Sequence, residues 1–101
     1  MPGADSLELE PTLVRRELIV KNANGLHLLP CSLIARAVKE FAGTVKLVRG
    51  SQSANAKSVM DVIQLGATCG TEVILEIDGP GAEPMADRIE QLFADEFMTD
   101  R

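Results

Sequence analysis

His27 is the one histidine of this 101-residue chain, and its surroundings could support phosphoryl chemistry. It follows the turn-forming segment Asn22-Ala23-Asn24-Gly25 and comes directly before a stretch with helical periodicity. At the start of a helix, the first backbone N–H groups lack intrahelical acceptors and the helix dipole is positive, so an anion is favoured there. A neutral imidazole can attack phosphorus, and the N–H groups of Leu28 and Leu29 can hold the resulting charge. These residues predict a phosphoryl acceptor at His27.

Two other interpretations of His27 stay open at this point. A histidine at a helix start can simply be a polar cap. His27 could also pair with Cys31, one helical turn further on, because a thiol in the first turn of a helix is acidified. However, no residue nearby in sequence would orient the imidazole, and Cys31 equally suits a core position. One histidine and two separated cysteines, Cys31 and Cys69, predict neither a metal site nor a disulfide framework, and no cofactor is expected.

The composition narrows the classes of function. Apolar residues make up 46% of the chain and charged residues 25%, which is the balance of one globular domain. The lack of Trp and Tyr and the net charge of −5 argue against nucleic-acid binding. No segment approaches the roughly 20 apolar residues of a membrane span, and the acidic start does not resemble a signal peptide. We therefore expect a cytoplasmic protein without membrane insertion.

The periodicity of apolar residues predicts the elements that would position His27. Strands are expected over 16–21, 44–49, 52–57 and 71–78, and helices over 28–42, 58–65 and 83–97. Strands with one apolar face, and helices that can cover it, imply an α+β two-layer sandwich. A ferredoxin-like arrangement shares much of this order, but the third helix favours a sheet with all its helices on one side.

The ends of these elements are predicted from prolines and glycines. Residues 1–13 are small, acidic and interrupted by prolines, so we expect a flexible tail ahead of a domain over 14–101. Pro30 fits only the first turn of the first helix, and Gly43 is expected to stop that helix. The last helix is expected to bury Phe97 near its end.

Two short motifs resemble one protein family. Gly25-Leu26-His27-x-x-Pro30, after Asn24, is similar to the active-centre signature of the HPr phosphocarriers of the bacterial phosphoenolpyruvate-dependent sugar phosphotransferase system. The segment 55–60 resembles the second signature of that family, and 70–73 matches the start of its last strand. The resemblance covers about residues 14–97. It implies an open-faced sandwich, in which three helices cover one face of a four-stranded antiparallel sheet.

The resemblance also implies a role for His27. It would accept phosphate at Nδ1 from phosphorylated Enzyme I and donate it to the A component of a sugar-specific enzyme II. The chain would then be a phosphocarrier rather than an enzyme. In that family an arginine stands two residues after the histidine and helps to hold the phosphoryl group, but this chain has Leu29 there. Because leucine lacks the charged hydrogen bonds of a guanidinium, we expect slower transfer or a phospho-form of different stability.

Other residues do not obviously replace the missing guanidinium. Arg36 lies two helical turns further along, which we expect to be too distant, whereas a partner protein could supply an arginine.

A second functional site is expected at Ser58, which with Asp61 has the pattern of a helix capping box. Capping alone would explain Ser58. In some family members, however, the matching serine is phosphorylated by an HPr serine kinase, and Asp61 would oppose such a phosphate.

The resemblance places apolar side chains on the surface around the histidine. They are Leu28, Leu29, Val59 and Met60, with Ile63 beside them. An exposed apolar patch of this kind marks a docking site for partner proteins.

One alternative function is an HPr-like regulatory interaction protein that is controlled by phosphorylation of Ser58 or His27 and does not serve sugar transport. A small-molecule-binding ferredoxin-like module is disfavoured by the third helix and the two signatures.

Overall fold

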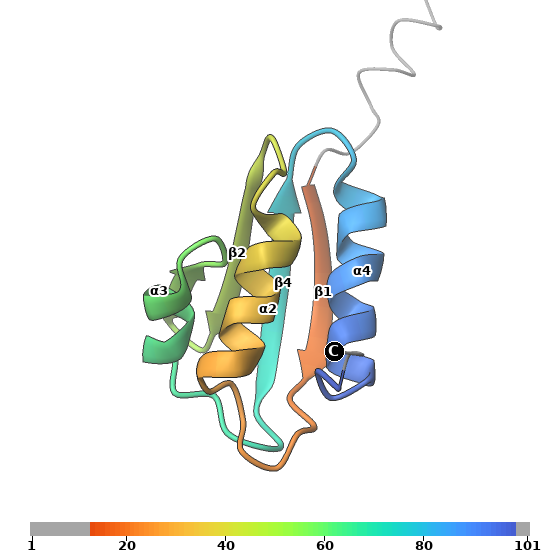
Figure 1. Ribbon diagram of the computed structural model, residues 1–101. Helices are drawn as coiled ribbons and strands as arrows, with labels where there is room; N and C mark the ends of the chain where they lie inside the picture. Colours follow the sequence, from red (N-terminus) through yellow and green to blue (C-terminus); the bar gives the residue numbers. More distant parts are fainter. Residues whose placement is uncertain (1–12, 99–101) are drawn as a thin grey trace, which may run out of the picture.

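One antiparallel sheet with three helices on one of its faces forms the protein (Figure 1). The computed structural model describes residues 13–98. In chain order, the elements are β1 (Leu13–Ile19), α2 (Leu28–Val38), β2 (Thr44–Arg49), β3 (Gln52–Asn55), α3 (Val59–Gln64), β4 (Glu72–Asp78) and α4 (Ala82–Ala94). The strand order is β1-β4-β2-β3, so β4 is central. This architecture confirms the predicted open-faced α+β sandwich.

The hydrophobic core lies between the sheet and the helices. On β4, the alternating residues Val73, Leu75 and Ile77 are all fully buried, which explains its place between β1 and β2. The helices contribute the apolar stripes that cover them, including Ile34 of α2 and Ile89 of α4. All the described elements therefore share one core.

Strand β1 begins at Leu13, three residues before the predicted start. Arg16 interrupts its apolar alternation, because this charged residue occupies an inward position between buried neighbours. The flexible tail expected over 1–13 lies outside the described residues, except for Leu13 itself. None of the described helices is long and apolar enough to span a membrane.

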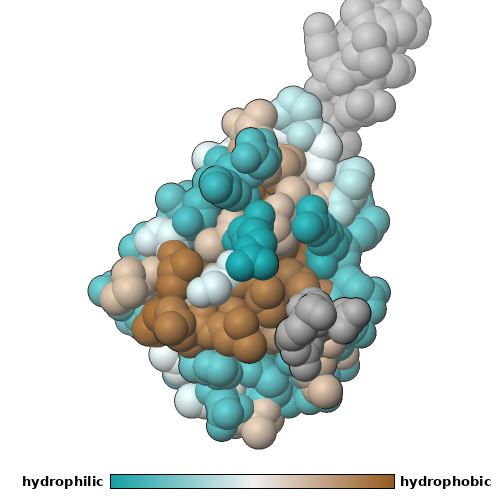
Figure 2. All heavy atoms as spheres, in the orientation of Figure 1, coloured by the Kyte–Doolittle hydropathy of each residue, from teal (hydrophilic) through white to brown (hydrophobic). Residues whose placement is uncertain are grey.

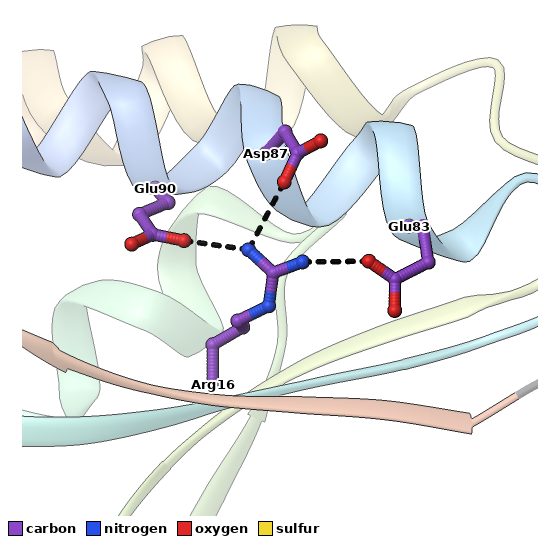
Figure 3. Close-up of polar contacts among 4 residues, drawn as sticks. All are labelled: Arg16, Glu83, Asp87 and Glu90. Carbon is purple, nitrogen blue, oxygen red and sulfur yellow. Dashed lines mark hydrogen bonds and ion pairs between the residues drawn. The ribbon is translucent and has the colours of Figure 1, made fainter.

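Arg16 joins β1 to α4 through three carboxylates (Figure 3). Its guanidinium lies 2.8 Å from Glu83 and 3.1 Å from Asp87, and it also binds Glu90. The hydrogen bond to Glu90 contributes most to raising the pKa of Arg16. The three acids recur on one face of α4, so this ion-pair cluster fixes the rotation of α4 over the edge strand β1.

Helix α2 ends at Val38, four residues before its predicted end. Gly43 was expected to stop this helix, but its role is different. A Cβ atom on Gly43 would lie 1.9 Å from the carbonyl oxygen of Asp78, so only glycine permits the close approach of this segment to the end of β4. The glycine belongs to the entrance of β2 and not to the helix.

Helix α4 also ends earlier than predicted, at Ala94. After it, Glu96 and Phe97 adopt left-handed backbone angles, with φ of 55° and 59°. The Phe97 N–H donates to the carbonyl of Leu92 at 2.8 Å, as in a Schellman turn. Phe97 is buried as predicted, and its ring centroid lies 5.0 Å from that of Phe93. The turn therefore folds the last described residues back onto the molecule.

Candidate functional site

His27 lies at the N-cap of α2 with its side chain exposed. Its backbone is extended, with φ of −90° and ψ of −165°, and its carbonyl accepts the first helical hydrogen bond from the Cys31 N–H at 3.1 Å. The imidazole makes no capping hydrogen bond. The interpretation of His27 as a side-chain cap is therefore wrong, and the ring is free to react.

Two backbone N–H groups are available beside the imidazole. Leu28 and Leu29 form the first two positions of α2, where no intrahelical acceptor exists. Pro30 has no N–H group, and the next N–H, that of Cys31, is already bonded. Among residues 13–98, neither leucine N–H has an acceptor. Two free N–H groups thus lie side by side at the start of α2, an arrangement that favours an anion.

The turn before His27 is held in place by a short set of hydrogen bonds. Asn22 Nδ2 donates to the carbonyl of Gly25, whose N–H donates back to the Asn22 carbonyl at 3.0 Å. The Leu26 N–H donates to the carbonyl of Ala67 at 2.9 Å, in the segment before β4. Gly25 has a φ of 70°, and a Cβ atom there would lie 2.5 Å from the Ala67 oxygen. Glycine is thus required for both its backbone angle and its packing.

Cys31 is a core residue and not a nucleophile. Its Sγ is fully buried and lies 3.4 Å from the carbonyl oxygen of Leu26, to which it donates. Burial raises the pKa of the Cys31 thiol to about 11, so the acidified thiol proposed for a His–Cys pair is wrong. Cys69 is exposed and forms no disulfide. Within the described part of the chain, no three His, Cys, Asp or Glu side chains come together as metal ligands.

A groove of about 440 Å³ runs beside His27, between the start of α2 and the last described residues. It is lined by Asn22, Ala23, Asn24, His27, Leu29, Pro30, Leu33, Arg36, Glu96, Phe97 and Met98. The sequence did not predict the wall at 96–98, because the last helix was extended through residue 97. The left-handed residues that form this turn are not glycines, so no sequence signal marks it. Arg36, expected to be too distant, lines the same groove as His27.

Hydrophobic surface gathers next to this groove, over the start of α2 and over α3 (Figure 2). Leu28, Leu29 and Met60 are 62%, 55% and 62% exposed, and we call these three residues the apolar patch. Val59 and Ile63 are half-buried and pack against the core. The predicted exposed surface therefore exists at Leu28, Leu29 and Met60, whereas Val59, which was also expected on the surface, lies half-buried at its base together with Ile63.

Ser58 occupies the N-cap of α3 as predicted. Its Oγ accepts a hydrogen bond from the Asp61 N–H at 3.2 Å. The Ser58 N–H donates to the carbonyl of Asn55, so the carboxylate of Asp61 does not complete the capping box. At the other end of α3, Arg49 donates to the Leu65 carbonyl at 2.8 Å. Both ends of this short helix are therefore tied to the rest of the molecule.

Comparison with known proteins points to one family. A sequence model described as "PTS HPr component phosphorylation site" matches residues 14–95. The phosphocarrier protein HPr of Treponema pallidum (strain Nichols) is 36% identical over 85 residues, which cover 84% of this chain and 97% of that protein. The corresponding protein of Cupriavidus necator is 32% identical, with coverage of 84% and 96%. The crystal structure of HPr-C-His from Thermoanaerobacter tengcongensis is similar with a TM-score of 0.80 at 25% identity, covering 87% of this chain and 99% of that one.

Proposed function

Because this chain belongs to the HPr family of phosphocarriers of the phosphotransferase system, we propose that His27 accepts a phosphoryl group from phosphorylated Enzyme I and passes it to the A component of an enzyme II. One observation carries this proposal. The exposed imidazole of His27 has no hydrogen-bond partner among residues 13–98, and it stands beside the free N–H groups of Leu28 and Leu29. Nucleophile and anion site are thus adjacent.

The transfer step uses the lone pair of the neutral imidazole. Nδ1 of His27 attacks phosphorus and forms the new P–N bond, while the bond from phosphorus to the donor breaks and its electron pair stays on the donor. The N–H groups of Leu28 and Leu29 donate to the phosphoryl oxygens and stabilise their charge. Delivery to the next protein is the same displacement with the His27 imidazole as leaving group. Exposure of the ring at the surface suits this exchange between two partners.

The apolar patch is the surface that we assign to docking. Leu28 and Leu29 flank the reacting ring, and Met60 extends the patch onto α3. Val59 and Ile63 support it from below, because both pack against the core. Large exposed apolar side chains around a reactive group favour burial against a partner. Enzyme I and the A component of enzyme II would bind there in turn.

Ser58 supports a second candidate function, in which the protein acts as a regulatory interaction module. A phosphate on Ser58 would stand at the N-terminus of α3, where the backbone N–H groups favour negative charge. Asp61, whose N–H binds the Ser58 hydroxyl, would repel it. The loss of the active-centre arginine at Leu29 favours this alternative. It would make phosphorylation of Ser58 by a serine kinase, or of His27, a signal to a partner and not a step in sugar transport.

Phosphorylation in vitro tests the carrier function. The protein is incubated with its cognate Enzyme I and labelled phosphoenolpyruvate. We expect an acid-labile, alkali-stable label that is absent from His27→Ala and retained in Ser58→Ala, and that moves to the A component of enzyme II. If active Enzyme I leaves the wild-type protein unlabelled, the carrier function is wrong. An acid-stable label from ATP and a kinase, lost in Ser58→Ala, would support regulation.

A further inference from the structure

Arg36 is the one basic residue among the described residues that line the groove beside His27. Building on the proposed function, we infer that Arg36 stabilises the phosphoryl group on His27 through its charge, acting across the groove. Leu29, which lies between them on the same wall, brings no charge of its own. The phosphorylated site would therefore combine the backbone N–H groups at the start of α2 with the charge of Arg36 near the end of the same helix.

The guanidinium of Arg36 is free to act in this way. It makes no ion pair or hydrogen bond with any other residue in the range 13–98. By contrast, Arg16 is held by carboxylates of α4, and Arg49 by the carbonyl of Leu65. Arg36 is exposed in the last turn of α2, so its charge is available to the groove and to a ligand there.

Arg36 and His27 line the same groove, and their separation along α2 sets how strongly the two can interact. Nine residues separate the two positions, which corresponds to roughly 13 Å along a helix. Helical side chains lean toward the N-terminus of their helix, so a long side chain at Arg36 extends in the direction of His27. At low salt, about 0.01 M, the Debye length is about 30 Å, so charges at a separation of this order are only partly screened. The effect is therefore electrostatic and does not require contact.

Glu96 is a second charged residue of the groove, and it allows the direction of the electrostatic effect on the phosphoryl group to be tested. Glu96 lines the opposite wall and has no ion-pair partner among the described residues. Its carboxylate repels a phosphoryl dianion on His27, whereas Arg36 attracts it. Glu96→Gln removes the charge at constant side-chain size, and Arg36→Gln replaces the guanidinium with a shorter neutral amide, so the two changes should act in opposite directions.

The equilibrium of phosphoryl transfer with Enzyme I is the measurement of choice. Its constant depends on the free energies of the free and phosphorylated proteins and not on how the partners dock. At low salt, we expect Arg36→Gln to lower the phosphorylated fraction of this protein, with a roughly two- to fivefold smaller constant. Glu96→Gln should raise the constant by a similar factor, and Arg36→Lys should restore most of the wild-type value.

Two controls separate charge from structure. Lys39→Gln removes another exposed cation, about one turn further along and outside the groove lining, and should leave the constant unchanged. Molar salt should abolish the effect of Arg36→Gln through screening. The inference is overturned if Arg36→Gln behaves like Lys39→Gln, or if Glu96→Gln shifts the constant in the same direction as Arg36→Gln. Absence of any phosphate on the wild type would instead overturn the proposed function.

Discussion

Leu29 stands at the position where the resemblance to the HPr signature implies an arginine. Its N–H group remains available, but its side chain is 55% exposed and apolar. Leu29→Arg places a guanidinium beside the phosphoryl group, and a charge-assisted hydrogen bond contributes about 1.5 kcal/mol or more. We therefore expect transfer from Enzyme I to become roughly tenfold faster, measured in a rapid-quench experiment.

Leu28→Arg is the matched control, because it replaces a similarly exposed leucine of the apolar patch at a position where the family resemblance does not imply an arginine. It should not accelerate transfer. A rate for Leu29→Arg that equals or falls below the wild-type rate would mean that the site and its partners are adapted to leucine.

Gly25 sets the path of the chain into the site. Alanine there meets both an unfavourable φ of 70° and the Ala67 oxygen at 2.5 Å. Gly50 has a similar φ of 59° but open space around it, so Gly50→Ala isolates the cost of the backbone angle. We expect Gly25→Ala to lower the free energy of unfolding by more than about 2 kcal/mol and Gly50→Ala by about 1 kcal/mol. Urea unfolding measures both, and equal losses would contradict the packing account.

Because of Cys31, we expect the free energy of unfolding to fall as the pH rises in the alkaline range. Burial raises the pKa of its thiol from 9.0 to about 11, so the folded state favours the neutral thiol. This contribution is complete below pH 9 and is lost as the pH rises toward 11, by up to about 3 kcal/mol. The free energy of unfolding of the wild type should therefore fall more steeply over this range than that of Cys31→Ala. Parallel pH profiles for the two proteins would contradict this cause.

The Arg16 cluster is the main polar link between β1 and α4. Three carboxylates of α4 surround one guanidinium of β1, so Arg16→Met leaves those carboxylates to repel one another. We expect a loss of about 1 kcal/mol in the free energy of unfolding, reduced by salt. Arg15→Met removes the single exposed ion pair of Arg15 with Glu76 and should cost only a few tenths of that amount. Equal costs in chemical denaturation would show that the cluster has no special role.

The elements themselves were largely predictable, because the alternation on β4 and the stripes on the helices are strong local patterns. The ends of elements were not. Arg16 concealed the start of β1, since its inward position depends on acids about 70 residues away. Gly43 fits the local pattern of a helix stop, whereas its absent side chain makes room for Asp78. Contacts with residues far away in the sequence set where β1 begins and what Gly43 does, so the local sequence pattern does not predict either.

At the scale of the whole molecule, the site is assembled from segments that lie far apart in sequence. His27 and its N–H groups were predictable, because a turn, a helix start and a proline are neighbours in the chain. The groove wall at 96–98 was not, because it depends on a left-handed turn that Phe97 stabilises by burial. Leu29 belongs both to the groove lining and to the apolar patch, and His27 lines the same groove, so the proposed chemistry and the proposed docking share one region of the surface.

One measurement tests the central claim most directly. The ¹⁵N-labelled protein is phosphorylated by Enzyme I and phosphoenolpyruvate and followed by NMR. We expect the ring of His27 to carry the phosphorus, and the amide resonances of Leu28 and Leu29 to move downfield as their N–H groups donate to it. Phosphate on another residue, or phosphorylation of His27 that leaves both amides unmoved, would contradict the account.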